Sequence, residues 1–99
     1  MYTSKLQSAE VDQLIEAVLS LENVEEAYRF FEDICTVSEL KSIAQRIDVA
    51  NMLREGMTYT SIAEKTGAST ATISRVNRSL QFGSDGYKLV FEKLDAKKQ

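Results

Sequence analysis

One short stretch of the chain, residues 69–78, carries the residue types that contact duplex DNA. If it is a helix, its outward side consists of small or hydroxyl-bearing side chains and two arginines: Ser69, Thr70, Ala71, Ser74, Arg75 and Arg78. Small residues at a helix start let the backbone approach a base edge, and the unpaired N–H groups there attract phosphate. Arginine can bind guanine through two hydrogen bonds. The stretch therefore predicts a helix that reads the major groove.

A second group of hydroxyls, Thr58, Tyr59 and Thr60, opens the preceding segment. Hydroxyls and backbone amides at a helix start commonly bind phosphate. The complete set of predicted DNA-binding residues is Thr58, Tyr59, Thr60, Ser69, Thr70, Ala71, Thr72, Ser74, Arg75 and Arg78. The alternative is that such side chains only keep a helix surface soluble.

Two short helices joined by a turn would position these residues. Such helices need a small residue where they touch and a residue tolerant of positive φ at the turn, and Ala63 and Gly67 have the required spacing. The residues expected to pack the pair onto the domain are Ile62, Ala68, Ile73 and Val76. Thr66 alone is polar where an apolar residue is expected. The pattern over 59–78 predicts a helix-turn-helix.

The rest of the chain also shows helical periodicity, and period-two alternation is absent. Residues that can cap a helix start are Asn23, Thr36, Thr58 and Ser69, and the expected breaks are Gly56, Gly67, Gly83 and Gly86. We therefore predict an all-α protein with six helices in a single domain, 1–99. Its expected parts are dimerisation helices in 1–35, a central helix in 36–56, the helix-turn-helix in 58–80 and a C-terminal helix in 84–96.

Composition argues against several classes of protein. The chain has no histidine and a single cysteine, Cys35, so the usual zinc sites, intramolecular disulfides and histidine-activated nucleophiles are excluded. No segment approaches the roughly 18 apolar residues of a membrane span, and no secretory signal opens the chain. We therefore expect a cytoplasmic protein that is not an enzyme, holds no metal and contacts no membrane.

Charge is distributed unevenly along the chain, whose net charge is −3. Residues 1–40 contain two basic and nine acidic side chains, whereas residues 41–82 contain six basic and three acidic ones. The segment that holds the predicted reading helix is thus the cationic one, as DNA binding requires.

Three motifs make the chain resemble the Trp repressor family over about residues 36–80. They are MLREGMT, the Gly67-Ala68 turn, and ATISR followed by Ser79-Leu80. The resemblance implies an intertwined homodimer that binds a palindromic operator with tryptophan as corepressor. It also implies that Arg46 and Arg75 sandwich the indole and that Thr70, Ala71 and Ser74 approach bases. The remaining residues implied to line the pocket are Thr36, Thr72 and Ser79.

Two positions depart from that family's pattern. Val76 replaces the glycine that leaves room beside the indole, and Ala63 replaces a lysine. Val76 therefore joins the predicted effector-pocket residues as an obstacle to tryptophan. We expect no cofactor, with tryptophan or another small effector as an open alternative, and the operator sequence is not carried over.

These observations predict a sequence-specific regulator that binds double-stranded DNA as a homodimer and acts as a repressor. A helical protein-interaction module that reuses the fold without binding DNA is the alternative. Such a module would place an exposed apolar patch on 69–78, whereas a DNA reader would place cations there.

Overall fold

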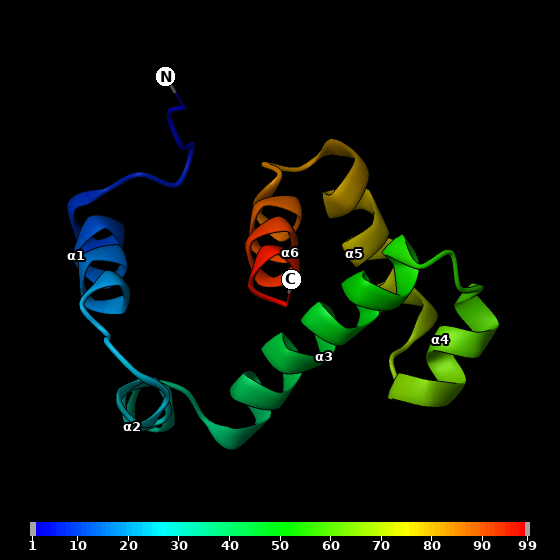
Figure 1. The fold of residues 1–99 in the computed structure, drawn as a ribbon, viewed down its shortest axis with the longest axis horizontal. Helices are drawn as coiled ribbons and strands as arrows, with labels where there is room; N and C mark the ends of the chain where they lie inside the picture. The colour runs from blue at the N-terminus through cyan, green and yellow to red at the C-terminus, as the bar shows by residue number, and fades with distance from the viewer. Residues whose placement is uncertain (1, 99) are drawn as a thin grey trace. The chain divides into compact units, whose positions relative to one another are not determined.

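The computed structural model describes residues 2–98, which form six α-helices and no strand (Figure 1). The helices are α1 (Ala9–Leu19), α2 (Val24–Ile34), α3 (Val37–Arg54), α4 (Tyr59–Thr66), α5 (Thr70–Phe82) and α6 (Gly86–Lys97). The predicted all-α fold class is confirmed. No helix within the described part of the chain is long and apolar enough to cross a membrane.

The helix starts lie where the sequence predicts them, because their capping side chains make the expected bonds. The side chains of Asn23, Thr58 and Ser69 each accept a backbone N–H from the first turn of the following helix. Before α3, the Thr36 hydroxyl accepts the Glu39 N–H at 3.0 Å, while the Glu39 carboxylate accepts the Thr36 N–H at 2.8 Å. This reciprocal pair is a capping box, and its backbone hydrogen bond lowers the pKa of Glu39.

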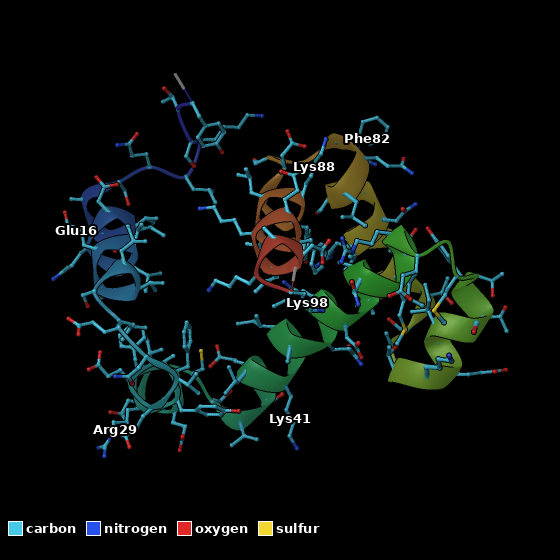
Figure 2. The ribbon with its side chains drawn as sticks, in the orientation of Figure 1. Glu16, Arg29, Lys41, Phe82, Lys88 and Lys98 are labelled. Carbon is cyan, nitrogen blue, oxygen red and sulfur yellow. The ribbon has the colours of Figure 1, made fainter. Side chains whose placement is uncertain are left out.

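The link between α5 and α6 corrects the predicted break at Gly86. Gly86 is the first residue of α6 rather than a breaker, and Asp85 before it adopts the left-handed conformation with φ of 62°. Helix α5 continues to Phe82, beyond its predicted end at Leu80, and Phe82 points outward from this end (Figure 2). Gly83 then ends α5 at a place where a Cβ atom would collide with the Ser79 backbone.

The chain divides into two compact units, which we call the N-terminal unit (Met1–Leu40) and the C-terminal unit (Lys41–Gln99). In the described residues of the N-terminal unit no side chain is fully buried. That the units work as one domain, with the parts assigned from the sequence, stays a prediction.

The core lies entirely within the C-terminal unit. Its buried side chains come from α3, α4, the following turn, α5 and α6: Val49, Ala50, Ile62, Ala68, Ile73, Val76 and Phe91. All are apolar, so within the described part of the chain the core contains no polar side chain that needs a buried partner. Helices α4 and α5, the pair predicted as a helix-turn-helix, therefore pack on α3 and α6.

A polar clasp at the core edge joins α3 to α6. The Arg54 guanidinium donates two hydrogen bonds to the Asp95 carboxylate, at 2.9 and 3.2 Å, and lies 4.4 Å from the centre of the Phe91 ring. The hydrogen bonds raise the pKa of Arg54 and lower the pKa of Asp95, since each charge favours the other. The clasp therefore fixes α6 and its buried Phe91 against α3.

Candidate nucleic-acid interface

The helix-turn-helix is built from α4, a three-residue turn and α5. Gly67 adopts φ of 75°, a left-handed conformation that L-residues with side chains rarely adopt, and the turn reverses the chain there. The residues predicted to pack the pair, Ile62, Ala68, Ile73 and Val76, are all buried. The predicted helix-turn-helix packing is therefore confirmed.

Thr66, the polar exception in the motif, has a structural reason. Its hydroxyl donates to the carbonyl oxygen of Ile62 at 2.8 Å and accepts the N–H of Ala68 at 3.0 Å. The first bond satisfies a helix carbonyl, and the second ties the end of α4 to the residue after Gly67. The hydroxyl thus stabilises the turn by hydrogen bonds where an apolar side chain would only pack.

The outward side of α5 has the predicted composition. The residues exposed on it and at its N-cap are Ser69, Thr70, Ala71, Ser74, Arg75 and Arg78. Thr58, Tyr59 and Thr60, at the start of α4, are also exposed, so both helix starts are open to solvent. The structure thus brings two helix N-termini and their hydroxyls onto the C-terminal unit's surface.

Thr72 differs from the other predicted DNA-binding residues. It is half-buried, its N–H donates to the Ser69 hydroxyl, and the Ser69 hydroxyl donates to the Thr72 hydroxyl, both at 3.1 Å. The two residues are therefore engaged with each other at the N-cap of α5. Thr72 does not extend outward as Thr70 and Ser74 do.

Among the residues that the structure describes, no carboxylate pairs with the arginines of the reading side. Within residues 2–98, the ion pairs join Arg29 to Glu25 and Arg54 to Asp95, and neither Arg75 nor Arg78 forms one. Unpaired guanidinium groups remain available to phosphate or to guanine.

Three of the predicted effector-pocket residues meet in the C-terminal unit. Arg46, Thr72 and Arg75, together with Ala71, line a hollow of about 140 Å³ between α3 and α5. Val76 is 2% exposed and belongs to the core instead of the wall of this hollow.

The other two pocket residues lie elsewhere. Ser79, with Arg46, lines a larger groove of about 610 Å³, whose apolar wall includes Ile43, Tyr87 and Val90. Thr36 is part of the N-terminal unit, where its hydroxyl caps α3. The structure thus brings together Arg46, Thr72 and Arg75, and it does not bring all six residues to one cavity of the described chain.

Sequence reasoning missed Gln45 and the Arg54–Asp95 clasp. Gln45 donates to the carbonyl oxygen of Thr66 at 3.2 Å, and Arg54 meets a partner 41 positions away. Local patterns carry no signal for either contact, because a polar residue on a helix has the same sequence signature whether it meets water or a distant helix.

The exposed, polar and cationic helix α5 follows a glycine turn and packs, together with α4, on α3 and α6. This architecture defines a helix-turn-helix protein. The model of the family described as Trp repressor protein matches residues 9–95. YerC of Bacillus subtilis (strain 168), an uncharacterized protein, is 53% identical over 94 residues, which cover 95% of this chain and 90% of YerC. The chain therefore belongs to the Trp repressor family, a family of regulators rather than enzymes.

Solved structures agree with this assignment. A TrpR-like protein from Eubacterium eligens ATCC 27750 is 63% identical with a TM-score of 0.88, over 92% of this chain and 94% of that protein. A protein from Staphylococcus aureus, described as a candidate Trp repressor, is 52% identical with a TM-score of 0.87, over 92% and 91% of the two chains.

Proposed function

We propose that this protein is a transcriptional repressor that binds double-stranded DNA in a sequence-specific manner through α5. The observation that carries the proposal is the division of α5 into two sides. Ile73 and Val76 are buried, while Thr70, Ser74 and Arg78 face solvent. A helix anchored by one side and exposing small, hydroxylic and cationic residues on the other fits a major groove.

The start of α4 supports the proposal as a phosphate contact. The Thr58 hydroxyl already accepts the Ser61 N–H at 3.2 Å, but Tyr59 and Thr60, the first two residues of the helix, are both exposed. Phosphate contacts of this kind hold the protein in register on the duplex while α5 reads bases. Because chromosomal DNA is the ligand, we also assign the protein to the bacterial cytoplasm.

Dimerisation is the second part of the proposal. The N-terminal unit exposes large apolar side chains on both of its helices, among them Leu14, Ile15 and Tyr28, which are 42%, 50% and 59% exposed. A second copy of the chain is the partner we assign to this surface, as the family membership favours. Two reading helices related by two-fold symmetry would contact half-sites about 34–36 Å apart.

The alternative of a protein-interaction module receives no support from residues 69–78, the part of the chain where it would require an exposed apolar patch. On residues 69–78 the exposed apolar side chain is Ala71, which is too small to form a docking patch. The cations on the same side favour DNA.

The decisive experiment selects duplexes from a random oligonucleotide pool and measures their affinity against salt concentration. We expect a palindromic preferred site and a log–log salt slope of several units. Replacement of Arg78 by Ala should weaken binding and reduce that slope by about one if Arg78 contacts a phosphate. The matched control is Arg29→Ala, an exposed arginine of α2, which should leave DNA binding unchanged. Absence of binding to every duplex at low salt would refute the proposal.

Regulation by tryptophan is not part of the proposal. The hollow that Arg46 and Arg75 line together holds about 140 Å³, below the roughly 300 Å³ at which small-molecule sites begin. The larger groove of about 610 Å³ contains Arg46 and Ser79 but not Arg75, so it does not offer the predicted pair of arginines. Val76 fills the neighbouring core position, so we propose that it holds α5 in its binding pose without a ligand. A protein already held in one state responds little to an effector.

Calorimetric titration with L-tryptophan, combined with DNA binding in its presence and absence, tests this part. We expect no sub-millimolar affinity for tryptophan and no tenfold gain in DNA affinity. The variant Val76→Gly should bind DNA more weakly without ligand, because it removes a buried side chain and loosens the helix. Tryptophan binding by the wild type, coupled to tighter DNA binding, would overturn the proposal on regulation and leave DNA binding intact.

A further inference from the structure

Gln45 of α3 contacts the end of α4 through a hydrogen bond that spans 21 positions of the chain. Its side-chain Nε2 atom donates to the carbonyl oxygen of Thr66 at 3.2 Å, and both residues are half-buried. Thr66 is the last residue of α4, and the final carbonyls of a helix have no partner within the helix. Gln45 therefore supplies the donor that the end of α4 lacks.

The carbonyl that accepts from Gln45 belongs to a residue whose hydroxyl also bonds across the turn. The Thr66 hydroxyl is bonded to Ile62 on one side and to Ala68 on the other, and Gly67 between them is left-handed. A bond to this carbonyl therefore constrains the whole turn and, through it, the start of α5.

The apolar core alone does not fix how the pair lies on α3. Burial of Ile62 and Ile73 against Val49 is favourable but non-directional, so it tolerates small rotations of the pair. A hydrogen bond weakens steeply when its geometry changes. The next residue of α3, Arg46, lines the hollow with Arg75 of α5. Two consecutive residues of α3 therefore lie beside the two helices of the pair, Gln45 beside the end of α4 and Arg46 beside α5.

We propose that Gln45 is a positioning residue for DNA reading, which fixes the tilt of the α4–turn–α5 pair on α3 through Thr66. This inference rests on the proposed DNA-binding function. Base-edge contacts need alignment within a few tenths of an ångström, whereas phosphate contacts carry charge and little sequence information. Loss of the Gln45 bond therefore reduces discrimination between sequences and preserves non-specific binding.

The test compares the wild type with Gln45→Met, which keeps the side chain's length and removes the donor. After selection of the preferred site, the measured quantity is the ratio of affinities for that site and for random duplex. We expect this ratio to fall about tenfold, with the non-specific affinity and the salt slope unchanged. The matched control is Gln13→Met, an exposed glutamine of α1, which should leave the ratio unchanged. A folded Gln45→Met with an unchanged ratio would overturn the inference.

A second measurement separates this inference from the proposed function. NMR relaxation dispersion without DNA should show millisecond exchange at residues 59–72 of Gln45→Met and none in the wild type, because the pair rocks when its bond is absent. If the wild type binds no duplex, the proposed function fails, and the exchange data still decide whether Gln45 positions the pair. If Gln45→Met does not fold, Gln45→Leu replaces it, since it also removes the donor and keeps an apolar side chain at this half-buried position. Equal exchange in wild type and variant would refute the positioning role.

Discussion

The two units of this protein contain similar amphipathic helices, but they differ in what covers the apolar side chains. In the C-terminal unit, α3 to α6 bury one another's apolar sides around Ile62 and Ile73. In the N-terminal unit, α1 and α2 leave large apolar residues such as Leu19 and Val24 more than 70% exposed. Periodicity predicts the helices equally well in both units. Periodicity does not indicate which surface the apolar side of each helix packs against.

The comparison also assigns different tasks to the two units. The C-terminal unit has a buried apolar core that can hold a reading helix rigidly, and it carries Arg75 and Arg78, which form no ion pair within residues 2–98. The N-terminal unit is rich in acidic residues, which disfavours DNA, and its open apolar surface suits association with a second copy. Variants made in each unit separately test this division of tasks.

The largest effect is expected from a charge placed on the apolar side of α1. Ile15→Asp should raise the dimer Kd by roughly two orders of magnitude, because burial of an unpaired carboxylate costs about 3 kcal/mol or more. Analytical ultracentrifugation should show the mass falling from twice 11.1 kDa to a single chain. Gln13→Asp adds the same charge on the opposite side of α1 and should not dissociate the protein. A wild type that is monomeric at micromolar concentration would refute the assignment of this surface to a second copy.

A smaller effect is expected from cavities in the two units. Ile73→Ala removes a fully buried side chain and should lower the free energy of unfolding by about 2–5 kcal/mol. Ile34→Ala removes the same atoms from a side chain that is 51% exposed, so its cost should be less than half as large. Urea unfolding of both variants in the monomeric Ile15→Asp background, where no second copy covers Ile34, measures both costs. Equal costs there would mean that Ile34 is buried within a single chain as deeply as Ile73, which contradicts the contrast between the units.

The smallest effect is expected from acid, through one carboxylate in each unit. Hydrogen bonds lower the pKa of Glu39 in the capping box and of Asp95 in the clasp with Arg54. A lowered pKa in the folded state means that the stabilisation is present above the unfolded-state pKa and disappears as the pH falls through the folded-state pKa. Stability should therefore decline at pH values below the ordinary range of these carboxyls. NMR titration of the two side chains should place both midpoints below their ordinary values.

Two variants test which of the two carboxylates, and so which unit, causes the loss of stability in acid. Asp95→Asn should remove the contribution of the clasp, and Glu39→Gln should remove the contribution of the capping box while an amide oxygen still accepts the Thr36 N–H. If the variants retain the full acid response of the wild type, other carboxylates cause it.

Features of the fold that depend on neighbouring residues could be predicted from the sequence. The start of α2, α3, α4 and α5 followed from capping side chains, and the packing side of α5 followed from the spacing of Ile73 and Val76. Those features are local, since a helix cap spans three residues and a helix face repeats every three or four. The helix-turn-helix and its exposed polar side could be predicted for the same reason.

The features that join distant segments of the chain could not be predicted and became visible in the folded molecule. The bond from Gln45 to Thr66, the clasp between Arg54 and Asp95 and the half-buried place of Thr72 follow from how helices lie against one another. The limited size of the hollow between Arg46 and Arg75 is also a tertiary property, because it depends on the distance between α3 and α5. A polar side chain on a helix looks the same in the sequence whether it faces water or another helix, and the assembled fold alone distinguishes the two.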